Sequence, residues 1–410
     1  MTMSLYQLEK DGAVRDLLGY LEDDAPPVLR ERAAAILGEV TLDADTEPMA
    51  IDRLVDRALH DERPQVRAVA IDTLDGIGAT AVDALIAASP VFDDETGGDI
   101  ETRYRNALRA AEPELRMAAA GRLGSIGSHA VLPPLIDAVE DSDYRVRVRV
   151  VRAIGTIGHD GGVPVLTRAL ADEAAPVRRE AADALGRIGT DRSLAPLIAG
   201  IADDDDHVRY LAASGLGACD TPAPIDPLLD AVSDPSDVVR EAACLSIIDL
   251  LATAPMERSD DIRSTVIAAI EPGNETMVRQ LIAIVTAGRN EPVRRNAVWL
   301  LGHLVSDRYV GRSVEALIDV LREDDPHIVN LAATSLVEIG GSTVELRALS
   351  LASDNGVPVS VRTKALYIVG KTGTSRSIGD LDAIRLGAQD DAIAHQATVA
   401  LANIDDSVTR

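Results

Sequence analysis

The sequence is poor in cysteine and aromatic residues and has no long hydrophobic run. Its 410 residues include two cysteines, Cys219 and Cys244, which are too few for a disulfide framework or a four-ligand zinc site. Both lie in apolar runs with helical spacing, so we expect buried, reduced thiols. No apolar stretch approaches the roughly 18 residues that span a membrane. Aromatic residues make up 2% of the chain, which leaves few platforms for stacking bases and argues against nucleic-acid binding.

Lysine is almost absent as well, and this indicates the kind of solvent to which the surface is adapted. The chain has 3 Lys against 37 Arg, 45 Asp and 22 Glu, and its net charge is −27. At 1 M salt the Debye length is about 3 Å, so repulsion among so many acids is screened. The composition resembles that of cytoplasmic proteins from extremely halophilic archaea, and residues 1–10 have no basic segment followed by an apolar one. We therefore expect a cytoplasmic, salt-adapted protein that does not bind membranes.

The most prominent feature that is present is an internal repeat. Five apolar anchors are each 31 residues from the next: Leu115, Val146, Val177, Val208 and Val239. Each anchor is followed by arginine, and an apolar residue stands eight positions later. A glycine at Gly127, Gly158 or Gly189 is placed to end a helix in three of these copies. Each unit is therefore predicted to be a helix, a turn with aspartate, a second helix and a glycine stop.

The same signature, less regularly spaced, covers nearly the whole chain. Further anchors are Leu29, Val66, Val293, Ile328, Val361 and Ile393. Because no single pair can bury both apolar faces of its second helix, the pairs must stack on one another. The predicted fold is all-α, a single right-handed α-α superhelical solenoid over residues 1–410 with about eleven helical pairs.

Two intervals interrupt the rhythm of the regular repeats, which we place at about 104–252. The predicted insertions lie at about 89–102 and 253–275. We interpret the first as an acidic loop from Phe92 to Asp99, and the second as containing an additional helix from Ser259 to Ile270. Insertions in such folds lie on the surface. They often carry function there, but sequence changes without function are also well tolerated.

These repeats resemble the HEAT-repeat family. The 31-residue unit with Val-Arg, Ala-Ala and Leu-Gly-x-Ile-Gly is similar to the short phycobilin-lyase-like subgroup, and the likeness covers residues 11 to 404. It implies that the second helices line a concave face and that partners bind there or along its edges. Halophilic archaea use proteins of this subgroup beside their taxis signalling components, and residues 4–9 resemble the start of such proteins.

An arginine follows almost every anchor, and we interpret this row as structural rather than as an anion-binding site. Each arginine stands five or six residues after a turn aspartate, so charge-assisted bonds between the two can form a ladder. The residues of this ladder are Asp141, Arg147, Asp172, Arg178, Asp203, Arg209, Asp234 and Arg240.

A second group of bases, Arg145, Arg149 and Arg152, shares one face of a predicted second helix. Residues 101–192 carry a net charge of +1, whereas residues 1–100 and 193–410 carry −14 each. The three arginines are therefore a candidate docking stripe for an acidic protein partner. The alternative is that neighbouring repeats pair their charges, because Glu180 and Asp183 occupy the equivalent positions 31 residues after Arg149 and Arg152.

The sequence has none of the common catalytic motifs. It lacks a Gly-Lys-Ser/Thr loop, a Gly-x-Ser-x-Gly elbow and a His-Glu-x-x-His pair, and none of its seven histidines stands beside a glutamate. We therefore predict no catalytic residue, no metal and no cofactor, and a scaffold or adaptor that binds another protein, with taxis signalling as one setting. The alternative is a bilin-lyase-like accessory or chaperone for a modified subunit, which an apolar pocket with converging polar groups would favour.

Overall fold

The computed structural model describes residues 8, 10, 12–89, 99–219, 223–253, 256–270, 274–287 and 291–408. In these ranges the regular elements are helices and no strand occurs, which confirms the all-α prediction. The chain divides into two compact units, residues 1–200 and residues 201–410, and each is a stack of helical pairs. One continuous solenoid over residues 1–410 stays a prediction.

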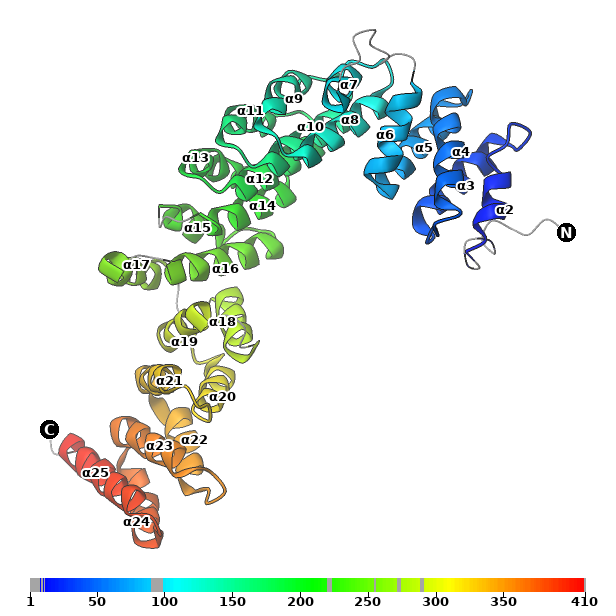
Figure 1. The fold of residues 1–410 in the computed structure, drawn as a ribbon. Coiled ribbons are helices and arrows are strands. Elements are labelled where there is room, and N and C mark those ends of the chain that lie inside the picture. Colours follow the sequence, from blue (N-terminus) through cyan, green and yellow to red (C-terminus); the bar gives the residue numbers. More distant parts are fainter. Residues whose placement is uncertain are drawn as a thin grey trace. The chain divides into compact units, whose positions relative to one another are not determined.

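Unit 1 contains the helices that Figure 1 colours from blue to green. They are α2 (Val14–Gly19), α3 (Pro27–Glu39), α4 (Glu47–His60), α5 (Pro64–Ile77), α6 (Ala79–Ala88), α7 (Ile100–Ala107), α8 (Pro113–Ile126), η2 (His129–Val131), α9 (Leu132–Ala138), α10 (Tyr144–Ile157), η3 (Asp160–Gly162), α11 (Val163–Ala169), α12 (Ala175–Ile188) and α13 (Asp191–Gly200). Helices α8, α10 and α12 lie side by side, as Figure 1 shows, and form the centre of this unit.

Unit 2 contains the remaining helices. They are α14 (Asp206–Gly217), α15 (Ile225–Ala231), α16 (Asp237–Thr253), α17 (Met256–Ala269), α18 (Glu275–Ala287), α19 (Glu291–Leu304), α20 (Val310–Val320), α21 (Pro326–Ile339), α22 (Gly341–Ser353), α23 (Val359–Thr372), η4 (Ser375–Ser377), α24 (Ile378–Gly387) and α25 (Asp391–Val408). Here α14 packs on α16, α19 on α21, and α23 on α25.

All eleven anchors of the sequence repeat fall in helices, which we call the second helices. They are α3, α5, α8, α10 and α12 in unit 1, and α14, α16, α19, α21, α23 and α25 in unit 2. Five of them begin 31 residues apart, at Pro113, Tyr144, Ala175, Asp206 and Asp237. The predicted period is therefore also the period of the helices.

Local sequence explains where these helices begin and end. In α10 the carboxylate of Asp143 accepts a hydrogen bond from the backbone N–H of Arg145 and caps the first turn. The helix ends at Gly158 with φ of 67°, a left-handed conformation in which glycine has no Cβ penalty. Gly127 and Gly189 end α8 and α12 in the same way, so the three predicted glycine stops are confirmed.

The repeated glycine inside the second helices serves packing instead. A Cβ added at Gly155 of α10 would lie 2.5 Å from Cβ of Ala184 on α12, closer than two carbon atoms can approach. The anchor Val146 and the later apolar residue Ile154 are both fully buried beside this contact. The Leu/Ile-Gly pair of each repeat thus lets neighbouring second helices pack closely.

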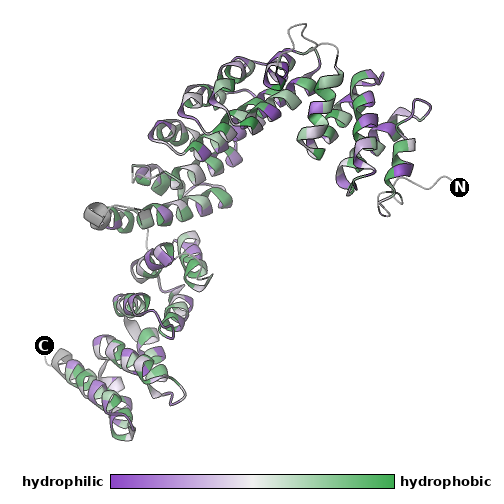
Figure 2. Cartoon of the chain, viewed as in Figure 1, coloured by the Kyte–Doolittle hydropathy of each residue, from purple (hydrophilic) through white to green (hydrophobic). Residues whose placement is uncertain are grey.

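The two predicted insertions have different outcomes. Residues 90–98, which include most of the expected acidic loop, lie outside the described residues, as do residues 4–7 and 9 of the N-terminal segment. The additional helix expected at 259–270 is confirmed as α17, Met256–Ala269. No helix among the described residues is long and apolar enough to cross a membrane. Figure 2 agrees, since hydrophilic and hydrophobic residues are mixed within the helices.

Candidate protein-interaction face

The arginines that follow the anchors connect one repeat to the next. Arg147 on α10 donates from Nη1 to the carbonyl oxygen of Asp141 at 2.9 Å, and from Nε and Nη2 to the two carboxylate oxygens of Asp172 at 2.8 Å each. Arg147 thus bonds the backbone carbonyl of the aspartate that precedes it, in place of the expected bond to its carboxylate. The carboxylate of Asp141 instead accepts from Arg116 of the previous repeat and from the backbone N–H of Asp143, which turns it away from Arg147.

The other ladder residues follow this geometry until the repeat is interrupted. Arg209 bonds the carbonyl oxygen of Asp203 at 2.9 Å and the carboxylate of Asp234 at 2.8 and 3.0 Å. Arg178 donates to the carbonyl oxygen of Asp172 at 3.0 Å. Arg240 keeps its bond to the carbonyl oxygen of Asp234, at 2.6 Å, but pairs with Asp237 of its own helix, since the insertion before α18 delays the next turn.

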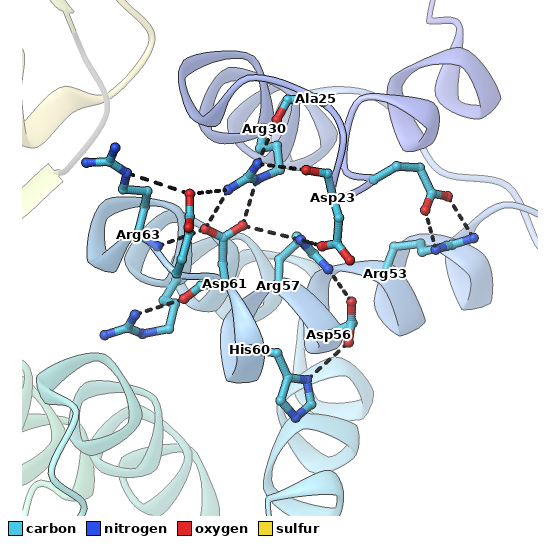
Figure 3. A network of polar contacts seen from close by, with 12 residues as sticks. Asp23, Ala25, Arg30, Arg53, Asp56, Arg57, His60, Asp61 and Arg63 are labelled. Atoms are coloured by element: carbon cyan, nitrogen blue, oxygen red, sulfur yellow. Dashed lines mark hydrogen bonds and ion pairs between the residues drawn. The ribbon is translucent and has the colours of Figure 1, made fainter.

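A variant of the ladder lies near the N-terminus, where Figure 3 shows a buried network. Arg30 on α3 donates to both carboxylate oxygens of Asp61 at 2.7 and 3.0 Å, and Arg57 lies 3.4 Å from the same carboxylate. The backbone carbonyl of Asp61 accepts from Arg67 at 2.9 Å. Since these arginines are occupied by acids and carbonyls of the chain itself, the geometry favours a structural role for the row over anion binding.

The surface available to a partner is the outward face of the second helices. We define it as the positions one before and two, six and ten after each anchor, which share one side of a helix. In unit 1 these positions hold mostly charged and small residues, with Val28, Met117 and Val148 as larger apolar ones, and neither histidine nor an aromatic residue; all of them belong to the described residues.

The three arginines of the candidate docking stripe lie on or beside this face and are all paired. Arg145 is 3.2 Å from Glu114 on α8 and 2.7 Å from Asp143. Arg152 is 2.7 Å from Glu180 on α12, whose other oxygen accepts from Arg187. The geometry thus corresponds to the alternative of charge pairing between repeats. Asp183 does not join it, because its carboxylate pairs with Arg187 of its own helix.

Arg149 reaches furthest of the three. Its guanidinium lies 2.6 Å from the carboxylate of Asp75 on α5, on the far side of α8. The pair passes over Gly121 of α8, where a Cβ would lie at ordinary contact distance, 3.5 Å from that carboxylate and 3.7 Å from the Arg149 side chain. The ion pairs of unit 1 therefore join α5, α8, α10 and α12 across their outward faces.

In unit 2 the same face has a different chemistry. All four histidines of residues 201–410 and three of the chain's few aromatic residues stand at outward positions: His207, Tyr210, Trp299, His303, His327, Tyr367 and His395. Trp299 on α19 is stacked on His303 at 4.5 Å between ring centroids, and Arg263 of α17 lies 5.2 Å from the Trp299 ring. Tyr367 on α23 is 41% exposed.

A groove with a volume of about 620 Å³ opens on this face between α14 and α16. One wall is formed by His207, Tyr210, Ser214 and Ala218 of α14, and the other by Val238, Glu241, Leu245 and Asp249 of α16. Val238 and Leu245 are 47% and 40% exposed, so the α16 wall of the groove is partly apolar. The groove exists because Ser214, Gly217 and Ala218 are small.

The floor of the groove is a tight contact between the two helices. A Cβ at Gly217 would lie 2.4 Å from Oγ of Ser246, whose hydroxyl donates to the carbonyl oxygen of Ala213 at 2.9 Å. Two carboxylates border the opening. Glu241 is 3.2 Å from Arg279, and partial burial raises the pKa of Asp249. The groove is therefore a rigid, mainly apolar trough with an acidic rim.

Sequence analysis missed this groove, although a signal was present. Arg152, Asp183, Ser214 and Leu245 occupy one register position in four successive repeats, and they change from charged to small to apolar. Among the described residues, no group of three or more metal-ligating side chains gathers. Cys219 and Cys244 are both buried, and burial raises the pKa of Cys244 to about 12.

Comparison with known proteins agrees with the repeat geometry. The family model for HEAT repeats matches residues 100–183, 132–209, 163–248 and 278–359, which together cover more than half of the chain. The chain belongs to the HEAT repeat family. The HEAT repeats lie where the 31-residue period is regular and again over α18 to α22.

A curated relative of this HEAT repeat chain is the HEAT repeat-containing taxis protein of Halobacterium salinarum. The two are 43% identical over 380 residues, which is 91% of this chain and 92% of the relative. Proteins built from HEAT repeats are generally non-catalytic scaffolds with extended binding surfaces.

Two solved structures are also similar to this chain. An engineered protein is 19% identical, covers 87% of this chain and 99% of its own, and has a TM-score of 0.45. The complex of CpcE and CpcF of phycocyanin lyase from Nostoc sp. PCC7120 is 17% identical, covers 68% of this chain and 97% of its own, and has a TM-score of 0.35.

Proposed function

We propose that this HEAT repeat protein is a non-catalytic scaffold that binds a partner protein through the outward face of unit 2, with the groove between α14 and α16 as the main anchor. The observation that carries the proposal is the exposure of Val238 and Leu245 over small residues in a trough of about 620 Å³. Binding energy in protein interfaces concentrates in such desolvated pockets, into which a partner places a few anchor residues.

The relative suggests the setting of this scaffold. Because the Halobacterium salinarum protein is named a taxis protein and shares 43% identity over 91% of this chain, we propose that the chain holds components of taxis signalling together. No reaction is required for that role.

The sequence suggested an acidic partner for Arg145, Arg149 and Arg152. Such a partner would have to displace Glu114, Asp75 and Glu180, which already pair with these arginines. The exchange would gain little free energy, because one carboxylate would replace another. We therefore place the main contact in unit 2.

Affinity capture from native cells in molar salt tests the proposal. Ser214→Arg places a long charged side chain in the groove, and Thr334→Arg makes the matched change at the same register position of α21, where Thr334 is exposed. We expect the wild type and Thr334→Arg to retain the same partner and Ser214→Arg to lose it. Retention by Ser214→Arg would contradict the proposed anchor.

The second candidate is an accessory of the bilin-lyase kind that shelters a chromophore or a modified subunit. It is favoured by the size of the groove, which lies in the range of small-ligand pockets, and by polar groups of His207 and Tyr210 beside the apolar wall. Titration with biliverdin in molar salt, followed by its absorption spectrum, separates the candidates. A spectral change that Ser214→Arg abolishes and Thr334→Arg preserves would favour the accessory role.

A further inference from the structure

Arg362, the arginine that follows the anchor of α23, has a guanidinium with one edge bound and the other open. Its Nε donates a hydrogen bond to the carbonyl oxygen of Ala352 on α22 at 2.8 Å. The side chain is partly buried, yet no residue in the described part of the chain bonds Nη1 or Nη2. These two nitrogens are therefore available to an acceptor from outside the chain.

Arg294 on α19 shows which group such an edge binds. Its Nε donates to the carbonyl oxygen of Val285 at 2.8 Å, just as Nε of Arg362 donates to a carbonyl oxygen of the preceding helix. Its Nη1 and Nη2 donate to the two carboxylate oxygens of Glu323, from Nη1 at 2.7 Å. A guanidinium held in this way presents a planar fork that matches a carboxylate, and the open edge of Arg362 has the same form.

The chain itself has no acid at the place that would fill the open edge. At Arg294 the acid is Glu323, which stands two residues before Asp325, the cap of α21. The equivalent residue before α25 is Ala388, because the Asp390 carboxylate accepts a hydrogen bond from a backbone N–H of the first turn. Ala388 has no carboxylate, so the edge stays open.

The preceding repeat shows that the arginine can be absent where the acid is absent. The residue after the anchor of α21 is Val329, and the equivalent acid position, two residues before the cap of α23, is Gly356. Arginine and acid are thus missing together at that junction. At the next junction Arg362 is present without its acid, which indicates a carboxylate supplied from elsewhere.

We infer that Arg362 binds an aspartate or glutamate side chain of the partner protein through Nη1 and Nη2. This inference rests on the proposed scaffold function and adds an acidic contact to the anchor in the groove. A partner acid at Arg152 of unit 1 would have to displace Glu180, but Arg362 has no carboxylate to exchange. The bond to the partner is therefore an additional one.

Exposed aliphatic side chains stand close to this edge in sequence, which suits a protein partner. Leu386 in the last turn of α24, two residues before Ala388, is 76% exposed. Val359, one turn before Arg362 on α23, is 39% exposed. A partner that covers these side chains would exclude water and ions from the pair, and a shielded pair is weakened less by molar salt.

Completing the pair within the chain is the first test. Ala388→Glu supplies the carboxylate that Glu323 supplies at Arg294, and Ala388→Gln is the uncharged control. In KCl of about 2 M we expect Ala388→Glu to shift the unfolding equilibrium about fivefold toward the folded chain, and Ala388→Gln to shift it less than about twofold. Adding Arg362→Gln should remove the gain. Urea denaturation followed by circular dichroism measures these shifts and shows whether each variant is folded.

Capture of the partner in the same salt is the second test, with the protein that the wild type retains identified by mass spectrometry. We expect Arg362→Gln and Ala388→Glu each to weaken capture about tenfold, because the first removes the fork and the second fills it. Arg385 is a nearby arginine that is already paired with Asp382 at 2.8 Å. Arg385→Gln and Ala388→Gln, as matched controls, should change capture less than about twofold.

Peptide competitors test the chemistry of the contact. Three peptides of about 12 residues combine leucine with glutamate, with glutamine or with phosphoserine, and each is added to the capture at about 10 mM. We expect the glutamate peptide to reduce capture by the wild type at least about twofold and the glutamine peptide to have no effect. Competition by the phosphoserine peptide without competition by the glutamate peptide would identify a phosphate as the occupant and contradict the inference.

The remaining outcomes separate this contact from the scaffold function. Undiminished capture by Arg362→Gln, equal competition by the glutamate and glutamine peptides, or a gain of stability in Ala388→Glu that persists with Arg362→Gln would each overturn the inference. If Ser214→Arg loses the partner and Arg362→Gln keeps it, the scaffold function stands and only the acidic contact fails. If neither variant loses the partner, both proposals fail.

Discussion

The two units of this HEAT repeat protein share their repeat chemistry but differ in the face that they present. In unit 1, the outward face of the second helices is covered by ion pairs such as Arg149–Asp75 and Arg152–Glu180. In unit 2, the equivalent positions hold histidines and aromatic residues, and Leu245 borders an apolar groove. The arginine–aspartate bonds between repeats are alike in both units, as Arg147 and Arg209 show.

Net charge does not distinguish these two faces. Unit 1 has 22 basic and 35 acidic residues and unit 2 has 18 and 32, so their net charges are −13 and −14. What differs is whether charges are paired with neighbours or frame an apolar space. Function is therefore assigned by placement of side chains on a common scaffold.

Removing salt should unfold both units alike, because both carry almost the same excess of acids. We expect complete loss of helical structure as KCl falls from about 3 M to about 0.1 M, since self-repulsion is then unscreened. Circular dichroism follows the whole chain. Trp299, Cys219 and Cys244 all lie in unit 2, so tryptophan fluorescence and thiol labelling follow that unit alone. An unchanged signal across this range would contradict the salt-adapted interpretation.

Reversing the paired arginines should affect unit 1 only. The triple variant Arg145→Glu, Arg149→Glu and Arg152→Glu places acids against Glu114, Asp75 and Glu180. We expect a loss of roughly 2–4 kcal/mol in the free energy of unfolding of unit 1, with unchanged Trp299 fluorescence. The same triple change to glutamine removes the attraction without adding repulsion, so it should lower the free energy of unfolding by less. A glutamate variant that is stable but no longer binds the partner would support the hypothesis that the three arginines are a docking stripe.

Removing one arginine of the ladder should lower the stability of either unit by a similar amount. Arg147→Ala and Arg209→Ala each leave a largely buried carboxylate, Asp172 or Asp234, without its bidentate partner. We expect each variant to lose about 1–3 kcal/mol of stability and to keep partner capture. Chemical denaturation measures the loss. A much smaller effect in one unit would show that the shared geometry is not equally stabilising.

Acid should weaken the same bonds in both units. At Asp172, burial tends to raise the pKa, but the bonds from Arg147 and the backbone N–H of Ala174 outweigh it and lower the pKa. The pKa of Asp234 is lowered in the same way, by bonds from Arg209 and from the backbone N–H of Ser236. A lowered folded-state pKa gives stability that is full above the unfolded value of about 4 and is lost as pH falls through the folded value.

Asp172→Asn and Asp234→Asn test this pH dependence. At pH near 7 each variant should be less stable than the wild type by about 1 kcal/mol, and the difference should shrink as pH falls below about 4. Urea denaturation at several pH values measures it. A difference that does not change with pH would exclude the carboxylates as the cause.

Local sequence features predicted the helical pairs of this protein. A period of 31 residues places the apolar anchors and the glycine stops, and the observed second helices from α8 to α16 begin 31 residues apart. These features are local, because caps and terminal glycines act within one turn of their own helix. The additional helix α17 was predictable for the same reason.

How the repeats bond to one another, and where a groove opens between them, depends on tertiary contacts. Arg147 and Arg209 bind the backbone carbonyl of the aspartate that precedes them, and the next repeat supplies the carboxylate. Likewise, Arg149 on α10 pairs with Asp75 on α5, which lies beyond α8. The groove depends on the approach of Gly217 to Ser246, which sets the spacing of α14 and α16 beneath Leu245. Such distances are fixed by side-chain volumes on both helices together, and no single segment of sequence contains them.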